Sequence, residues 1–120
     1  MSTESQLTRR LCGAMELRGA ITCAIVGNVM QGRGWPDRYV AWRDWNGWLE
    51  FKSRDGVLGV TQRVTLIRLR AMGHVQCWVV RYLDGLNQMQ VEWVDGSVHA
   101  MALNVGGLMT ELVRLKEVRI

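Results

Sequence analysis

The chain has 120 residues, a formal net charge of +4 and a pI near 9.4. Its content of 48% hydrophobic and 22% charged residues is typical of a folded globular domain, which excludes a disordered or low-complexity protein. The length predicts a single domain that can bury a core, and the mild positive charge suits a polyanionic partner.

Cysteine usage and hydropathy exclude two further classes of protein. Cys12, Cys23 and Cys77 form no CxxC pair and no cluster with histidine, so a zinc site is not expected. An odd, scattered set of cysteines is typical of reduced, cytosolic proteins. The longest apolar window, residues 19–30, is too short to span a bilayer, and no signal-peptide pattern is present. We therefore expect a cytoplasmic protein without a membrane partner.

Residues 3–17 have the periodicity of an amphipathic helix. Glu4 suits the positive end of the helix dipole in the first turn. The apolar stripe consists of Leu7, Leu11, Ala14 and Met15. Arg9 and Arg10 lie off this stripe, where they can be solvated or can contact phosphate. Residues 20–26 are then predicted to form a buried strand.

Two apolar runs follow, residues 38–42 and 47–53, and together they predict an antiparallel hairpin. Residues at positions i and i+2 of a strand point to one face, so Glu50 and Lys52 would lie side by side. Leu49 and Phe51 would point to the opposite face, into the core. In such a hairpin Asp37, which opens the first run, returns close to Glu50.

The turn of this hairpin can be predicted in two ways. Asn46-Gly47 is the strongest two-residue turn signal in the chain, but a tight turn there would place Asp37 opposite Gly56. Bringing Asp37 opposite Phe51 requires a wider loop over residues 42–46. We adopt the wider loop, because it brings two carboxylates and an ammonium group together.

Two carboxylates beside an ammonium group are typical of metal-dependent phosphodiester hydrolysis. Carboxylate oxygens hold Mg²⁺ and leave ligand positions for water and phosphate. A lysine at this place can orient the attacking water or stabilise the charge that builds on the phosphate. The alternative is an ordinary half-buried hairpin in which Glu50 and Lys52 form a surface ion pair.

The rest of the chain predicts a second helix, a strand and a C-terminal extension. Residues 60–72 form the helix. Its expected buried side consists of Val60, Val64 and Ile67, with Leu66 and Met72 as further candidates. Residues 74–81 follow as a buried strand. Residues 89–103 predict a hairpin that turns at Asp95-Gly96, and a short helix is expected around residues 108–115.

Several motifs in this order resemble one nuclease superfamily. They are Thr3-Glu4-Ser5-Gln6-Leu7, Gly32-Arg33-Gly34-Trp35-Pro36-Asp37, Glu50-Phe51-Lys52, Gln62 and Ala71-Met72-Gly73. Pro-Asp and Glu-x-Lys are weak motifs singly. In this order, with the Gln and the Gly, they resemble the PD-(D/E)xK nuclease superfamily and, within it, the VRR-NUC (virus-type replication-repair nuclease) group. The resemblance covers residues 3–81.

The resemblance implies an α/β fold with a restriction-endonuclease-like core. This core consists of a helix, a three-stranded antiparallel meander, a helix and a strand, to which a C-terminal β-hairpin and short helix would be added. Residues 1–120 would form one nuclease domain, with the core at about residues 3–81 and the extension at about residues 82–120.

The resemblance also implies the residues of a site. Asp37 and Glu50 would hold Mg²⁺ or Mn²⁺ together with the backbone carbonyl of Phe51. The family usually places a Glu of the first helix near the metal; Glu4 is the preferred candidate and Glu16 the competitor. The implied catalytic residues are Glu4, Asp37, Glu50, Lys52 and Gln62. The basic residues implied to contact DNA are Arg9, Arg10, Arg33 and Arg63.

The function implied by the resemblance is that of a divalent-metal-dependent DNA endonuclease. It would be selective for four-way junctions or flaps in phage or bacterial recombination or repair. The partner would be branched DNA, without a nucleotide cofactor, in the cytoplasm of a bacterial or phage-infected cell. The alternatives are a catalytically idle DNA-binding module of the same fold and a basic protein-interaction module.

Stand-alone proteins that resemble this chain tend to be homodimers. We expect the contact to lie in the apolar segment from Met89 onward, with Trp42, Trp45 or Trp48 as additional candidates. The apolar residues of this segment are Val91, Trp93, Val98, Met101, Leu103, Leu108, Met109, Leu112 and Val113. Alternatively, the segment covers the open edge of the sheet within one chain.

Overall fold

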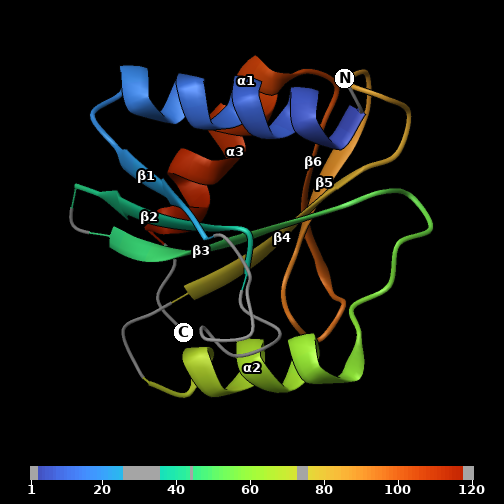
Figure 1. Cartoon of the computed structure of the whole chain (residues 1–120). Coiled ribbons are helices and arrows are strands. Elements are labelled where there is room, and N and C mark those ends of the chain that lie inside the picture. Colours follow the sequence, from blue (N-terminus) through green and yellow to red (C-terminus); the bar gives the residue numbers. More distant parts are fainter. Residues whose placement is uncertain (1–2, 26–35, 44, 73–75, 118–120) are drawn as a thin grey trace.

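A six-stranded β-sheet forms the centre of the structure, a computed structural model that describes residues 3–25, 36–43, 45–72 and 76–117. The elements are α1 (Thr3–Leu17), β1 (Ile21–Ala24), β2 (Arg38–Trp42), β3 (Trp45–Lys52), α2 (Val60–Arg70), β4 (Gln76–Tyr82), β5 (Met89–Glu92), β6 (Val98–Ala102) and α3 (Val105–Lys116). The strands lie in the order β1-β2-β3-β4-β5-β6. Helices α1 and α3 cover one face of the sheet and α2 covers the other (Figure 1).

Strand pairing follows the predicted order of elements. The first three strands form an antiparallel meander, and β4 pairs in parallel with β3. A parallel pair requires a crossover connection, which α2 provides. β5 and β6 continue the sheet as an antiparallel hairpin, and Gly96 in its turn has a φ of +89°. The predicted sequence of helix, meander, helix, strand and added hairpin is therefore confirmed.

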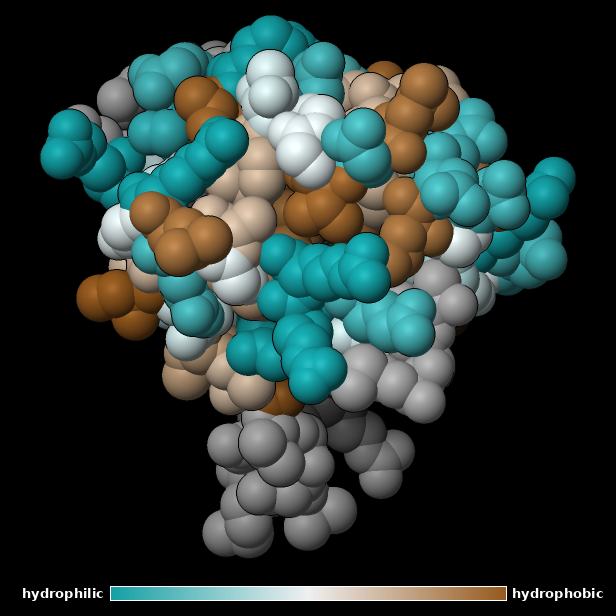
Figure 2. Space-filling view, turned by 90° about the horizontal axis from the view of Figure 1, so that it is seen from above, coloured by the Kyte–Doolittle hydropathy of each residue, from teal (hydrophilic) through white to brown (hydrophobic). Residues whose placement is uncertain are grey.

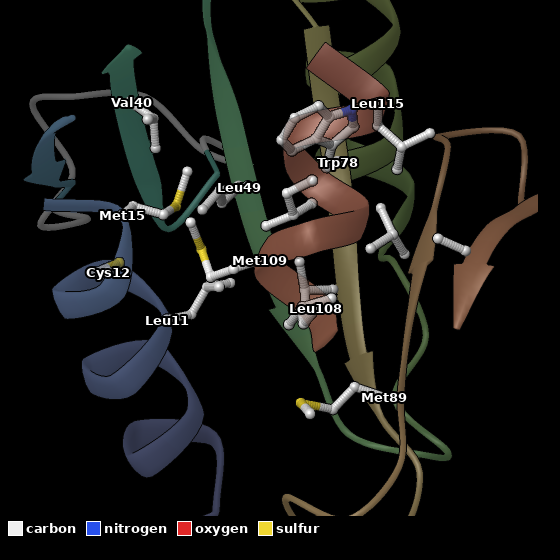
Figure 3. Packing of buried hydrophobic residues seen from close by; sticks show 14 of the residues in the cluster. Leu11, Cys12, Met15, Val40, Leu49, Trp78, Met89, Leu108, Met109 and Leu115 are labelled. Carbon is white, nitrogen blue, oxygen red and sulfur yellow. The ribbon is translucent and has the colours of Figure 1, made fainter. Parts of the chain in front are cut away.

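The main core lies between the sheet and the two helices α1 and α3 (Figure 3). The predicted stripe of α1 packs here, with Leu7, Leu11 and Met15 fully buried. Helix α3 contributes Leu108, Met109, Leu112 and Leu115. The rings of Trp45 and Trp78 stack in the same core with their centroids 4.3 Å apart. Full burial of side chains of this kind stabilises a fold by roughly 1.5–3 kcal/mol each, so this core holds both helices on the sheet.

The buried side of α2 differs from the predicted one. Leu66 is the buried residue of this helix, and it packs with Cys77 and Val94 in a small second core. Most residues that were predicted to be buried are exposed, namely Val60, Val64, Ile67 and Met72. The prediction of this face was therefore wrong. Apolar side chains lie on several sides of the helix, and the sheet covers the side that carries Leu66.

β1 is shorter and more exposed than the predicted buried strand. It covers Ile21–Ala24, and three of its four residues are exposed; Ile21 is 72% exposed. The prediction of a buried strand was wrong because β1 is the outermost strand of the sheet.

The hairpin of β2 and β3 has a narrower turn than predicted. Trp42 pairs with Trp45, so the loop over residues 42–46 is not formed. Continuing this register places Asp37 opposite Glu50, one residue from the predicted partner. The wider loop was therefore wrong in detail, although the hairpin still returns Asp37 to the carboxylate.

Gly47 lies inside β3 rather than in a turn, for a reason of packing. A Cβ atom at this position would lie 2.5 Å from the ring of Trp45 and 2.6 Å from the backbone oxygen of Gln76. Glycine is thus required by the close approach of β4 and of the indole. The strong turn signal of Asn46-Gly47 is overridden for this reason.

The C-terminal extension is largely buried within the chain. β5 extends the sheet beyond β4, and α3 packs against α1 and β6. The predicted contact residues that are buried here are Val91, Trp93, Leu108, Met109 and Leu112, together with Trp42 and Trp45. The prediction that these side chains form a dimer contact was wrong, because they fill the core of one chain. Val98, Met101 and Leu103, in or beside β6, are exposed.

The surface on the α1 side carries hydrophilic residues with hydrophobic ones interspersed (Figure 2). Within the described ranges, none of the helices has the length and apolar character needed to span a membrane.

Candidate functional site

Asp37 and Glu50 are each held by a backbone amide from the other strand of their hairpin. The amide of Asp37 donates a hydrogen bond to Glu50 Oε1 at 3.1 Å, and the amide of Phe51 donates one to Asp37 Oδ2 at 2.9 Å. Asp37 directly precedes β2 and Glu50 lies near the end of β3, so the hairpin register brings them together. The predicted pair of carboxylates is assembled, and Glu50 is only 3% exposed.

Lys52 and Gln62 approach the same oxygen of Glu50. Lys52 Nζ lies 3.4 Å from Glu50 Oε2, and Gln62 Nε2 donates a hydrogen bond to this atom. Lys52 shares a face of β3 with Glu50, and Gln62 comes from the first turn of α2, which covers that face. The side chain of Lys52 is 21% exposed, so its ammonium group can reach the surface. Four of the predicted site residues therefore meet at one place.

Burial and the Asp37 carboxylate raise the pKa of Glu50 from 4.5 to about 7. The first cause is desolvation, which disfavours the charged form, and the second is the negative charge of Asp37. Lys52 acts in the opposite direction but with a smaller effect. Two carboxylates held together in a buried place are a frequent sign of a functional site. A divalent cation between them would relieve their repulsion.

An open cleft of about 570 Å³ lies between α1 and the residues around β1 and β2. Asp37 lines this cleft, so one of the two carboxylates borders it. Glu4 and Glu16 of α1 also line the cleft, and Glu16 accepts a hydrogen bond from Thr22 Oγ1 at 2.6 Å. Both candidates for the acid of the first helix therefore share the cleft with Asp37, whereas Glu50 and Lys52 lie on the face of the sheet that α2 covers.

The oxygen ligands available at this site fit a divalent cation that has few protein ligands. In the part of the chain that the structure describes, no three His, Cys, Asp or Glu side chains lie close enough together to hold a metal. A role of Glu4 near the metal stays a prediction. Mg²⁺ in phosphate chemistry usually has one or two carboxylate ligands plus water and substrate phosphate. The amide and carbonyl of a strand residue point to the same side, so the Phe51 carbonyl also points toward Asp37.

The arginines predicted to contact DNA lie on different elements. Arg9 lines the cleft, Arg10 is exposed beside it on α1, and Arg63 is exposed on α2. Arg33 lies outside the described residues. Arg38 also lines the cleft, although it was not among the arginines predicted to contact DNA. Its place directly after the Pro-Asp motif was the available signal.

Comparison with known proteins identifies the fold. No family model matches the chain, and no curated protein matches its sequence. Among solved structures, the chain is similar to Hjc, a Holliday junction resolvase from the archaeal hyperthermophile Archaeoglobus fulgidus, with a TM-score of 0.58 and 13% sequence identity. The similarity covers 88% of this chain and 92% of the Hjc chain. It confirms the predicted PD-(D/E)xK-like fold. The finer assignment to the VRR-NUC group stays a prediction.

Proposed function

We propose that this protein is a divalent-metal-dependent endonuclease that cleaves branched DNA, such as four-way junctions or flaps. The observation that carries the proposal is the pair of half-buried Asp37 and buried Glu50, with Lys52 and Gln62 on the Glu50 carboxylate. The similarity in fold to a Holliday junction resolvase supports DNA as the partner and phosphodiester hydrolysis as the reaction.

Asp37 and Glu50 would hold Mg²⁺ or Mn²⁺, with the Phe51 carbonyl as a further ligand. When bound, such a cation supplies a Lewis acid for the phosphoryl oxygen and lowers the pKa of a coordinated water. The raised pKa of Glu50, about 7, means that this carboxylate binds a proton when no cation is present. Cation binding would therefore release a proton below about pH 7 and become weaker as the pH falls.

Lys52 and Gln62 would have different roles. The ammonium of Lys52 is near Glu50 but partly exposed, so it can orient the attacking water or stabilise charge that develops on the phosphate. Gln62 holds Glu50 Oε2 through its amide group, which fixes the orientation of that carboxylate. Glu4, from α1, would act on water in the cleft.

DNA would be bound mainly through its phosphates. Arg9 and Arg38 line the cleft, Arg10 and Arg63 are exposed, and the chain has a net charge of +4. Contacts between cationic side chains and phosphate make binding fall steeply with salt concentration. The preference for a branched structure would come from the shape of the cleft and the spacing of these arginines.

A cleavage assay tests the proposal. Supercoiled plasmid, single-stranded, flap and four-way-junction DNA are incubated with the purified chain in Mg²⁺, Mn²⁺ or EDTA. We expect metal-dependent cutting of the branched substrates. Tight DNA binding without cutting in either metal would indicate the idle DNA-binding module, and the absence of both binding and cutting would favour a protein-interaction module.

A homodimer would suit a four-way junction, because two-fold symmetry supplies two sites for two symmetric cuts. Since most of the expected contact residues are buried, the contact would have to use exposed apolar residues such as Val98, Met101 and Leu103. Sedimentation at micromolar concentration tests this proposal. A monomer that still cuts a junction symmetrically would contradict it.

A further inference from the structure

Arg81 of β4 holds a carboxylate and a loop at the same time. Its Nε lies 2.6 Å from Glu92 Oε2, and its Nη2 donates a hydrogen bond to Glu92 Oε1 at 3.3 Å. Its Nη1 donates to the backbone oxygen of Ser53 at 2.7 Å and also to that of Gly56. Gln90 Nε2 donates to Glu92 Oε2 at 2.6 Å, so the carboxylate is held from two sides.

The loop held by Arg81 connects two residues of the proposed site. Lys52 ends β3 directly before Ser53, and Gln62 lies in the first turn of α2, which begins four residues after Gly56. Arg81 is also the parallel partner of Lys52 in the sheet, so the two basic side chains are neighbours on one face. Any shift of residues 53–56 would move both side chains that contact Glu50 Oε2.

The guanidinium of Arg81 is poorly placed for direct contact with DNA. Its side chain is 14% exposed, and its nitrogens are occupied by Glu92 and by loop carbonyls. An effect of Arg81 on the site would therefore act through the position of the loop.

We propose that Arg81, fixed by Glu92, is a positioning residue for the nuclease site: it holds the loop over residues 53–56 so that Lys52 and Gln62 stay on the Glu50 carboxylate. This inference rests on the proposed function. A planar guanidinium can bind a carboxylate with two nitrogens and still donate to two carbonyls, which the single nitrogen of lysine cannot do.

The substitution Arg81→Lys tests the proposal because it keeps the charge and removes the branched geometry. We expect kcat for cleavage of four-way-junction DNA to fall by about 10- to 100-fold, the usual cost of displacing a catalytic group by about 1 Å. KM and DNA affinity in EDTA should stay within about twofold, because the cleft is not altered. Glu92→Gln, which weakens the hold on Arg81, should give a smaller fall in kcat.

A double-mutant cycle with Lys52→Ala decides whether Arg81 acts through Lys52. If it does, adding Arg81→Lys to Lys52→Ala should lower kcat much less than it does in the wild-type background. Full additivity in this cycle and in the matching cycle with Gln62→Ala would overturn the proposal, because it would mean that Arg81 affects activity through neither side chain.

Amide hydrogen exchange gives a readout that needs no activity. The amide of Gly56 donates to Ser53 O at 3.0 Å, so its protection reports on the loop. We expect Arg81→Lys to increase exchange over residues 53–62 and to leave α3 unchanged. If the wild-type chain does not cut DNA, the proposed function fails, but this measurement still shows whether Arg81 holds the loop. Faster loop exchange with an unchanged kcat would overturn the positioning role alone.

Arg114→Lys is the matched control. Arg114 also combines a carboxylate, Glu111 at 2.8 Å, with a backbone oxygen, that of His99 at 3.3 Å, but it lies on α3 away from the proposed site. We expect this substitution to leave kcat and loop exchange unchanged. An equal fall in kcat in both variants would mean that Arg81 has only a general structural role.

Discussion

Glu50 and Glu92 are the two buried carboxylates among the described residues, and their surroundings differ sharply. Both pair with Val79 in the sheet, Glu50 from β3 and Glu92 from β5, so they lie in one row on the same face. Glu92 is matched by the two-nitrogen contact of Arg81 and by Gln90. Glu50 faces a second carboxylate, that of Asp37, and its cation Lys52 is 3.4 Å away.

The difference indicates what each carboxylate is for. A buried charge with a complete set of partners can serve the fold, because its charge and hydrogen bonds are satisfied. A buried carboxylate beside another carboxylate raises the free energy of the folded protein. A site that binds a cation and a phosphate during its function would account for this cost. We therefore propose a structural role for Glu92 and a functional role for Glu50.

The largest expected effect is on activity, and it separates the two carboxylates directly. Asp37→Asn and Glu50→Gln should each lower kcat for DNA cleavage by about 10³-fold or more, because each removes a charged ligand for the cation. Circular dichroism should show that both variants are folded. Activity near that of the wild type in either variant would place the metal elsewhere. Binding of Mn²⁺ measured by calorimetry should be lost in parallel.

The next largest effect is expected on the free energy of unfolding, when Glu92 is replaced. Glu92→Ala leaves the largely buried Arg81 without its carboxylate, which should lower the free energy of unfolding by roughly 3–5 kcal/mol. Glu50→Gln should not destabilise the metal-free protein, because it removes the repulsion with Asp37. Urea denaturation in EDTA at pH 7.5 measures both variants. A larger loss for Glu50→Gln than for Glu92→Ala would reverse our assignment of the two carboxylates.

The pH dependence of stability sharpens the comparison further. Because the pKa of Glu50 is raised from 4.5 to about 7, the folded state keeps a proton that the unfolded state releases between these values. The contribution of Glu50 to stability is therefore fully present below pH 4.5 and is lost as the pH rises to about 7. At 1.36 kcal/mol for each pKa unit, the total change is on the order of 3 kcal/mol.

The difference in unfolding free energy between the wild type and Glu50→Gln isolates this change. Urea unfolding in EDTA from pH 4 to pH 8 should show that the wild type loses stability relative to the variant as the pH rises. Carboxyl groups that do not interact with Glu50, such as Asp95, are present in both chains and cancel. A flat difference would mean that the pKa of Glu50 is not raised.

The smallest change in the free energy of unfolding is expected for an exposed pair of Glu and Arg. Glu111 and Arg114 on α3 have side chains that are 32% and 56% exposed. Glu111→Ala should change the free energy of unfolding by less than about 1 kcal/mol, because solvent screens the charges of such a pair. A loss as large as that of Glu92→Ala would show that burial is not what distinguishes the Arg81 pair.

The amino-acid sequence by itself determined the elements with strong local periodicity and the order of the site residues. Leu7, Leu11 and Met15 recur at helical spacing, and α1 buries them as predicted. Asp95-Gly96 between two apolar runs predicts the last hairpin, which is formed. The spacing of Glu50 and Lys52 placed them on one face because strand periodicity is a property of the backbone alone.

The tertiary structure decided which faces are covered and which charges meet. Val60, Val64 and Ile67 have helical spacing, yet the sheet packs against Leu66, because a helix with several apolar sides does not specify which of them faces the core. Gly47 stays in a strand because the Trp45 ring and the Gln76 carbonyl approach it closely.

Arg81 and Glu92 were not singled out from the sequence, since nothing local to either residue indicates the partner. They are eleven positions apart, on strands whose pairing places them together, and Arg81 reaches back to a loop twenty-five to twenty-eight positions before it. Contacts between residues distant in the chain depend on sheet order and register. Those are determined by the packing of the whole core and not by any single segment.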